Sequence, residues 1–369
     1  MLCIVIQDIA VVPMDSEETV VNQFVPKGVT QRELARRLGV SQATVSRVLA
    51  KNARHSQKMR ETVTEAAVRL GYRPDPVFAN MNEYKRLRRA VRRQTLAWFS
   101  AMPYGAGQYE TMLFQAARAR AEALGYGMDY FWEHDPGYSS KRYEQIFSTR
   151  GIAGVIFGPR TQPHARVEME IDHFAAVAMG RSVDWPPVDR VSTDHFQTMT
   201  LCYDSVRARG FRRIGFSLAK SYSERVDGVW TAAFLGQQLR NPGLPKIPPL
   251  LDDDPSASGN FKAWFRKWKP EALITMGWHF GHLGALRRMG LRFPEVVGVA
   301  LLVVPCYVPE DFPALNGFSG ILEPLSGLAA FAVDILVGRI RNNERGIPAD
   351  RRVHLLPGTW TEGTTLREK

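Results

Sequence analysis

The sequence predicts a small all-α domain followed by a larger α/β body that consists of two lobes with parallel sheets. Three observations indicate this fold class. The chain has 369 residues, of which 45% are hydrophobic, enough for two or three domains with apolar cores. Basic residues are concentrated near the N-terminus, in a region whose local pattern is helical. From residue 94 onward, short apolar runs alternate with helical stretches, which is typical of parallel sheets covered on both faces.

The distribution of charge points to a nucleic-acid-binding module. Residues 27–93 contain 17 basic and five acidic residues, a net charge of +12. The rest of the chain contains 31 basic and 32 acidic residues and is nearly neutral. A basic head on a neutral body is expected of a module that binds nucleic acid. A basic face that contacts only solvent is the alternative, and charge alone does not exclude it.

The cysteines and the N-terminal residues indicate where the protein acts. Cys3, Cys202 and Cys306 are too far apart for a C-x-x-C metal or redox motif, so we expect a reducing cytoplasm and no metal site. The apolar run that opens the sequence is not preceded by basic residues, and Gln7 and Asp8 interrupt this run. We therefore expect neither a signal peptide nor a membrane span. Residues 1–28 are expected to form a flexible extension.

Two short helices joined by a tight turn are expected at the start of the 29–74 domain. Thr30 and Glu33 have the spacing of a capping box that opens the first helix, and Gly39 is suited to end it. Ser41 is a good N-cap for a second helix over residues 42–49. This arrangement predicts a helix-turn-helix. A third helix is expected to begin after Ser56.

The outward face of the second helix is expected to meet DNA. Its apolar residues share one side, so four others point outward near its N-terminal end: Gln42, Ala43, Ser46 and Arg47. Arg47 can pair with guanine, Gln42 with adenine, and the Ala43 methyl group can touch a thymine methyl. Three further residues have hydroxyl groups suited to phosphate oxygens: Thr30, Ser41 and Thr44.

The run 29–49, followed by Arg60 and residues 70–74, resembles the DNA-binding head of the LacI/GalR family of bacterial transcriptional regulators. The resemblance implies a sequence-specific regulator, a repressor, that binds a pseudo-palindromic operator as a homodimer. In this family a hinge helix follows the head and inserts a leucine into the minor groove. The corresponding residue here is Met81, flanked by Asn80 and Asn82.

Residues 75–93 are expected to form this hinge and a basic linker. The segment 85–93 is strongly basic. It is equally well interpreted as adding phosphate contacts or as a solvated linker without DNA contact.

The body, residues 94–369, also resembles the LacI/GalR family, whose effector domain is similar to type I periplasmic binding proteins. Strands are expected at 96–102, 127–132, 154–158, 174–180, 213–218 and 272–276, and helices at 109–124, 141–148, 196–209 and 226–239. The resemblance implies two lobes, a cleft between them that binds a small-molecule effector, and dimerisation through the body. Asp194 and Arg225 lie in matching runs, and the matching arginine of the family binds the effector.

Two positions depart from the family's pocket. Trp278 and His279 stand where the family usually has an Asn-Asp pair, and Ala300 ends a run that an aspartate usually follows. Trp278 could stack on a ligand, although a tryptophan at a strand end is more often part of a core. The effector therefore stays open: a sugar, another small molecule, or none.

Other classes of protein fit less well. Gly105 and Gly107 between a strand and a helix, with Glu133 after the next strand, imitate a dinucleotide fingerprint, but Glu110 replaces its third glycine. An NAD(P)-dependent enzyme on a Rossmann-like domain is thus the alternative to a regulator that is not an enzyme and needs no cofactor. His279 and His282 have no carboxylate or cysteine nearby for a metal site. An exported solute-binding protein is inconsistent with the basic head.

Overall fold

The computed structural model describes residues 29–49, 56–70, 72, 94–253, 259–276, 281–304 and 317–367. The chain divides into two compact units, Met1–Arg89 and Ala90–Lys369. The expected extension 1–28 and the expected hinge and linker 75–93, with Asn80, Met81 and Asn82, lie outside the described residues.

The first unit contains the three expected helices, α1 (Gln31–Leu38), α2 (Gln42–Leu49) and α3 (Gln57–Arg69). Helix α1 ends at Gly39, whose φ of 64° favours glycine. The Ser41 Oγ accepts a hydrogen bond from the Thr44 N–H at 3.1 Å and so caps α2. The turn between α1 and α2 is therefore built as its sequence predicts.

The capping box at the start of α1 is only half formed. The Thr30 Oγ1 accepts from the Glu33 N–H at 3.2 Å, as predicted. In a complete capping box the Glu33 carboxylate would accept from the Thr30 N–H. Here it accepts instead from Arg36 at 2.7 Å and from Arg37 at 2.9 Å. These arginines lie one turn further along the same helix face. Their hydrogen bonds hold the pKa of Glu33 down at about 2.

Apolar residues from all three helices form the core of this unit: Leu34, Ala35, Val45, Val48, Val63, Ala66 and Ala67. Both α2 residues in this core are among those expected to point inward. Burial of this side orients the opposite side of α2 toward solvent.

The first lobe of the body is a six-stranded sheet in the order β13-β7-β5-β3-β1-β2. Its strands are β1 (Thr95–Ser100), β2 (Gly127–Trp132), β3 (Ile152–Phe157), β5 (Ala175–Met179), β7 (Asp189–Thr193) and β13 (Val353–Leu356). All neighbouring strands are parallel. Helices α5 (Gln108–Ala123) and α12 (Leu325–Arg341) contribute to one apolar core, and α6 (Ser140–Arg150) contributes to the core on the opposite face. Two short strands, β4 (Ala165–Arg166) and β6 (Val183–Trp185), form a separate parallel pair. In the sequence, β4 comes between β3 and β5, and β6 comes between β5 and β7.

The second lobe is a six-stranded sheet in the order β14-β12-β11-β10-β8-β9. Its strands are β8 (Ile214–Leu218), β9 (Leu250–Leu251), β10 (Ala272–Thr275), β11 (Gly298–Leu301), β12 (Ser319–Leu322) and the antiparallel β14 (Thr359–Thr361). Helices α7 (His195–Ala208), α8 (Lys220–Arg225) and α9 (Val229–Arg240) lie around one core. Helices α10 (Asn260–Trp268) and α11 (Gly281–Arg288) belong to the other.

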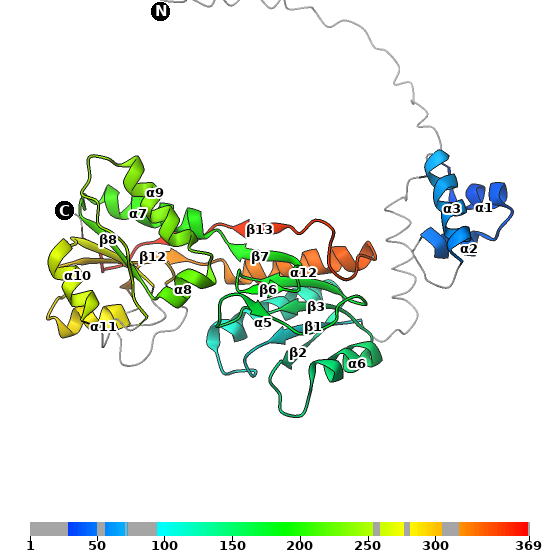
Figure 1. Ribbon diagram of the computed structural model, residues 1–369, viewed down its shortest axis with the longest axis horizontal. Helices are drawn as coiled ribbons and strands as arrows, with labels where there is room; N and C mark the ends of the chain where they lie inside the picture. The colour runs from blue at the N-terminus through cyan, green and yellow to red at the C-terminus, as the bar shows by residue number, and fades with distance from the viewer. Residues whose placement is uncertain are drawn as a thin grey trace, which may run out of the picture. The chain divides into compact units, whose positions relative to one another are not determined.

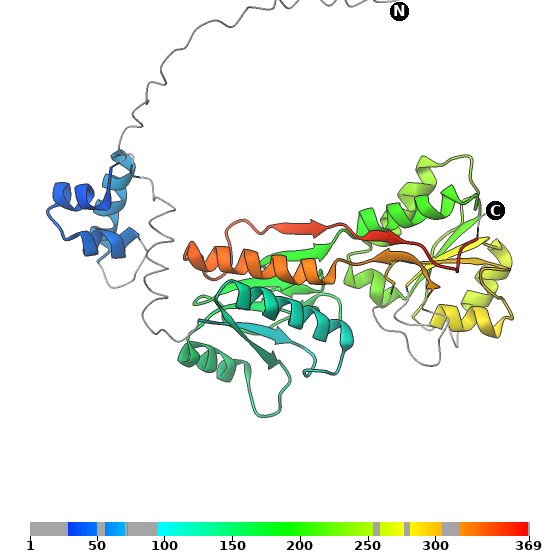
Figure 2. The ribbon, with the colours of Figure 1, turned by 180° about the vertical axis from the view of Figure 1, so that it is seen from behind.

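The described chain passes between the lobes three times, from β7 to α7, from β12 to α12, and from β13 to β14 (Figures 1 and 2). The fold class of the body is as predicted from the sequence. The return of α12 and β13 to the first lobe was not foreseen, because local patterns do not say which sheet a helix covers. None of the described helices is long and apolar enough to cross a membrane.

The prediction of a helix over 226–239 is wrong at its start, because α9 begins at Val229. The backbone has φ of 55° at Asp227 and 67° at Gly228, and these left-handed residues separate α8 from α9. Gly228 was the signal in the sequence, since glycine adopts positive φ without strain. The break leaves Arg225 at the last turn of a short helix.

Candidate nucleic-acid interface and interlobe pocket

The start of α2 presents two of the expected base-reading side chains to solvent. Gln42 and Ala43 are exposed, and Ser46 is partly exposed. Arg47 belongs to α2, but its side chain lies outside the described part of the structure. Helix α2 thus has a polar, accessible N-terminal end, as a recognition helix requires.

A chain of amides holds Gln42 in place. Its Nε2 donates to Gln31 Oε1 at 2.8 Å, and Gln31 Nε2 donates to the Tyr72 hydroxyl at 3.0 Å. Gln31 and Tyr72 were not among the residues expected to matter. Their contact joins residues 41 positions apart, which no local pattern could indicate.

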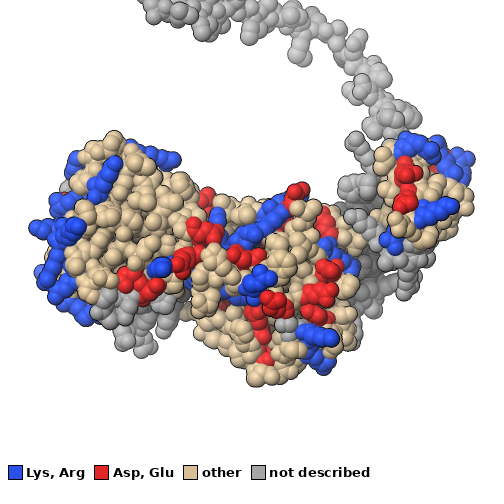
Figure 3. All heavy atoms as spheres, in the orientation of Figure 1, with Lys and Arg blue, Asp and Glu red and all other residues tan. Residues whose placement is uncertain are grey.

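The expected phosphate-contacting residues lie at the starts of α1 and α2. Thr30 and Ser41 are exposed N-caps, and Ser41 Oγ and Thr44 Oγ1 share a hydrogen bond of 2.9 Å. Helix N-termini attract anions through their free N–H groups and the helix dipole. Figure 3 shows Lys and Arg side chains on the helical unit, with acidic residues between some of them.

A pocket of about 350 Å³ lies between the two lobes of the body. The first lobe contributes Tyr109, Glu110 and Arg160, and the second contributes Tyr222 and Arg225. Further lining residues follow the carboxyl ends of strands in both sheets: Met102, Gly180, Arg181, Met276, Val303 and Glu323. This is the edge at which parallel α/β sheets bind ligands.

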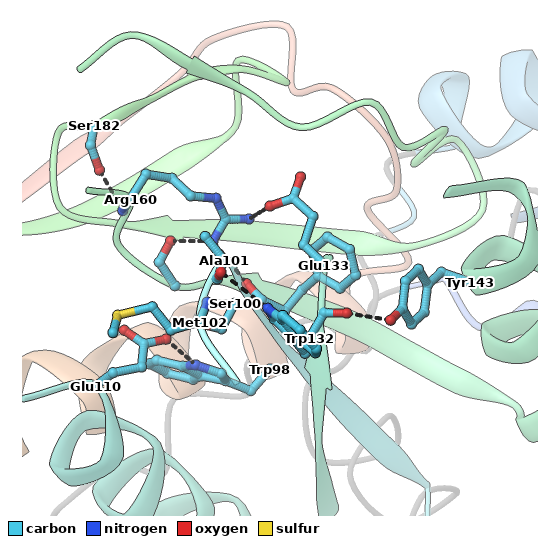
Figure 4. Close-up of polar contacts among 12 residues, drawn as sticks. Trp98, Ser100, Ala101, Met102, Glu110, Trp132, Glu133, Tyr143, Arg160 and Ser182 are labelled. Atoms are coloured by element: carbon cyan, nitrogen blue, oxygen red, sulfur yellow. Dashed lines mark hydrogen bonds and ion pairs between the residues drawn. The ribbon is translucent and has the colours of Figure 1, made fainter. Parts of the chain in front are cut away.

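Arg160 is fixed in the first-lobe wall, with only 4% of the residue exposed. Its Nη1 donates to the carbonyl oxygens of Phe99 at 3.2 Å and Gly158 at 3.0 Å, and its Nη2 lies 3.1 Å from Glu133 (Figure 4). Burial lowers the pKa of Arg160, and the nearby Glu133 opposes that shift. The guanidinium is therefore a rigid part of the wall whose charge is largely balanced by Glu133.

Two carboxyl groups also line the pocket, the buried Glu110 and the half-buried Glu323. Glu110 accepts from the Trp98 indole N–H at 2.8 Å, and Glu323 accepts from the Thr193 hydroxyl at 2.8 Å (Figure 4 for Glu110). Burial raises the pKa of both groups, which favours their neutral forms. Glu110 occupies the place of the third glycine in a dinucleotide fingerprint, the glycine that permits close packing of helix against strand.

Four polar side chains of the pocket lining come from both lobes. Arg181 follows β5 of the first lobe, and His195, Arg225 and Trp230 belong to helices of the second. The rings of His195 and Trp230 are in edge contact, with centroids 4.8 Å apart. The Arg225 guanidinium carbon lies 5.0 Å from the centroid of the Tyr222 ring. We call these four residues the donor corner, because each has a buried nitrogen without a hydrogen-bond partner among the described residues: Arg181 Nε, His195 Nδ1, Arg225 Nε and Trp230 Nε1.

The three residues expected to bind an effector have different surroundings. Arg225 lines the pocket. Asp194 is not part of the lining; its carboxylate accepts from the Gln197 N–H at 2.9 Å and caps α7. Trp278 lies outside the described residues. Ala300, the other departure from the family pattern, is fully buried in the second-lobe core.

No group of three or more potential metal ligands occurs among the described residues. Sequence analysis missed Arg181, His195 and Trp230 in the pocket. His195 directly follows Asp194, so the matching run around Asp194 was a signal for it. Arg181 and Trp230 belong to a loop and a helix start whose approach depends on the packing of the lobes.

Known proteins resemble both units of the chain. The model of bacterial regulatory proteins of the lacI family matches residues 30–75. The HTH-type transcriptional regulator AscG of Escherichia coli (strain K12) is 38% identical over 335 residues, which are 83% of this chain and 92% of AscG. The chain belongs to the LacI family. It is therefore a DNA-binding transcriptional regulator.

A second curated regulator and two solved structures also resemble the chain. The transcriptional repressor PurR of Edwardsiella ictaluri (strain 93-146) is 25% identical over 326 residues, covering 84% of this chain and 90% of PurR. A Lac repressor dimer bound to operator and the anti-inducer ONPF has a similar fold, with a TM-score of 0.54, 20% identity, and coverage of 92% of this chain and 100% of that one. The regulator CelR in complex with cellobiose has a TM-score of 0.54 and 17% identity, and the match covers 91% of this chain and 99% of CelR.

Proposed function

We propose that this LacI-family regulator represses transcription as a homodimer on a pseudo-palindromic operator, and that a small molecule in the interlobe pocket changes its operator affinity. The single observation that carries the effector half of this proposal is the donor corner, whose buried nitrogens line the pocket and have no hydrogen-bond partner within the described part of the chain. Buried donors without partners cost free energy that a bound ligand would recover. We place the protein in the cytoplasm, where bacterial DNA lies.

In the proposed complex, α2 enters the major groove. Four residues of α2 read bases: Gln42, Ala43, Ser46 and Arg47. Phosphates bind at the helix starts marked by Thr30, Ser41 and Thr44, because the first N–H groups of a helix have no partner within the helix and the helix dipole favours an anion there. Met81, with Asn80 and Asn82 beside it, wedges into the minor groove.

The effector acts by binding two lobes at once. Arg225 and Tyr222 belong to the second lobe, and Tyr109 and Arg160 to the first, so a ligand that contacts both sets changes the relative free energy of open and closed arrangements. Only a difference in affinity for those arrangements can change DNA binding. Asp194 contributes indirectly, by capping the helix that starts with His195. Trp278 is proposed as a stacking face.

The structure of CelR with cellobiose supports a ligand of saccharide size for this fold. A two-fold symmetric site is expected because one recognition helix reads only a few base pairs, and a symmetric dimer doubles them.

Selection of duplexes from a random library by the full chain tests the DNA half of the proposal. We expect two inverted half-sites. The variant Arg47→Ala should relax the preference at one base pair in each half-site, at a cost of about 1–3 kcal/mol. The variant Arg118→Ala is the matched control, because Arg118 lies in α5 of the body and pairs with Glu122. An asymmetric motif, or one that Arg47→Ala leaves unchanged, would contradict the proposal.

A further inference from the structure

The donor corner has an unusual chemistry for a pocket that binds a neutral sugar. Trp230 is only 2% exposed and His195 only 8%, and both have a ring nitrogen without a partner among the described residues. The indole N–H and the arginine Nε–H can only donate hydrogen bonds. A ligand group that satisfies them must therefore present acceptors.

The four members of the donor corner line the same pocket, and His195 interacts with each of the other three. His195 and Trp230 touch, with ring centroids 4.8 Å apart. Burial lowers the pKa of His195 to about 3, and the positive charges of Arg181 and Arg225 add to that effect. The imidazole is therefore neutral, and the positive charge near it comes from the two arginines.

Charge balance leaves one cation of the pocket without a compensating carboxylate. Arg181 pairs with Asp227 at 3.0 Å, and Arg160 pairs with Glu133 at 3.1 Å. Arg225 forms no ion pair with a carboxylate within the part of the chain that the structure describes. Glu323 interacts electrostatically with Arg225, but desolvation raises the pKa of this half-buried carboxyl group. One negative charge on the ligand would complete this balance.

Most of the lining groups that can accept hydrogen bonds from sugar hydroxyls are not members of the donor corner: Gln108, Glu110, Thr161, Ser182, Ser192, Thr193 and Glu323. A sugar hydroxyl both donates and accepts, so a sugar site needs acceptors as well as donors. Ala300 is fully buried in the core and has no polar side-chain atom. The rest of the lining is rich in apolar side chains: Met102, Leu113, Met179, Met276, Val303 and Leu328.

We infer that the effector has one anionic, acceptor-only group, a carboxylate or a phosphate, which binds the donor corner, and a less polar body that lies against the apolar lining. This inference rests on the proposed function, because it assigns the chemical class of the ligand of the same pocket. Arg225 provides the charge, and Trp230 Nε1 and Arg181 Nε provide directed hydrogen bonds.

The indole N–H of Trp230 provides a direct test. The full chain is labelled with ¹⁵N-tryptophan, and the Trp230 signal is assigned from its absence in Trp230→Phe. Sodium phosphate, sodium acetate and methyl β-glucoside are titrated separately at pH 7 in a zwitterionic buffer, with sodium chloride holding ionic strength constant. Trp264 is the internal control, because its indole N–H already donates to the Pro248 carbonyl at 2.9 Å.

We expect phosphate or acetate to shift the Trp230 signal saturably. The anion that binds with the lower half-saturating concentration identifies the anionic group of the effector. The glucoside should not shift it, and Trp264 should not move. Arg225→Gln should raise the half-saturating anion concentration about tenfold, while Arg118→Gln should not. Unchanged signals from the other tryptophans show that each variant is folded.

Two results would overturn the inference: a saturable shift with the glucoside alone, or no shift with either anion at tens of millimolar. Neither result depends on DNA. The symmetric motif obtained by library selection tests the proposed function independently, so failure of one is distinguishable from failure of the other.

Discussion

His195 has its charge state set by its surroundings. Its ordinary pKa of 6.5 falls to about 3, because burial disfavours the charged ring and Arg181 and Arg225 repel a further positive charge. Between these two values the unfolded chain binds a proton that the folded chain does not. The free energy of unfolding therefore rises with pH across this window, and stability is lost as the pH falls below 6.5.

We predict that His195→Gln flattens this dependence. The slope of the free energy of unfolding against pH, measured by denaturant titration below pH 6.5, should fall by up to about 1.4 kcal/mol per pH unit. Trp230→Phe is the control, since it alters packing beside the ring without removing a titrating group. Equal slopes for the wild-type chain and His195→Gln would show that the histidine is not held neutral.

The position of a residue was predictable where its motif is contiguous. Arg225 was expected in the pocket from its matching run, and it lines the pocket. Asp194 was selected in the same way but caps α7, because an aspartate before a helix serves as an N-cap whether or not a ligand is near. Trp230 could not be distinguished from an ordinary core aromatic by sequence, since it is marked only by an indole N–H that has no partner among the described residues.

The turn between α1 and α2 depends on Gly39. Its φ of 64° is unfavourable for a residue with a Cβ, yet an added Cβ would meet no atom within 4 Å. Gly39→Ala should therefore cost about 1 kcal/mol through backbone strain alone. Amide hydrogen exchange in α1 and α2 of the full chain should become about fivefold faster.

Gly236→Ala is the matched control for that prediction. Gly236 lies inside α9, its Cβ would also meet nothing within 4 Å, and its φ is not positive. Alanine should slow exchange in α9 or leave it unchanged, because alanine favours helix. Unchanged exchange in α1 and α2 of Gly39→Ala would contradict the assigned turn.

A buried ion pair joins α12 to β7 after the chain has returned to the first lobe. Arg339 and Asp189 are 4% and 6% exposed, and Arg339 Nη1 lies 3.3 Å from Asp189 Oδ2. Arg339→Met leaves the carboxylate buried without its cation, which should cost about 3–5 kcal/mol in free energy of unfolding. Combining it with Asp189→Asn should recover part of that loss. If the single variant loses less than about 1 kcal/mol in free energy of unfolding, the ion pair does not stabilise the packing of α12 on the first lobe.

Elements were predictable to the extent that their signals are local. The strand expected at 127–132 has the bounds of β2, and Ser41 and Gly39 lie at the helix ends predicted for them. The break between α8 and α9 was missed because the apolar pattern continues across Gly228. The position of α12 was beyond prediction, since its apolar face fits a sheet in either lobe.

At the scale of the whole molecule, function depends on the three chain crossings in the body. In the proposed mechanism these crossings allow the two lobes to change their relative position while the pocket lies between them. A ligand held by Arg225 on one side and the first-lobe wall on the other would be coupled to that motion. Coupling free energies of this kind are about 1–3 kcal/mol, which changes affinity about 5- to 150-fold.

The operator affinity of the full chain, with and without the low-molecular-mass fraction of a cell extract, tests this account most directly. The operator is the duplex obtained by library selection, and affinity is measured by fluorescence anisotropy at constant salt. We predict at least a fivefold change in the dissociation constant, absent in Arg225→Gln. Equal dissociation constants with and without the extract fraction, for a chain that binds a symmetric operator, would contradict the claim that the interlobe pocket controls DNA binding.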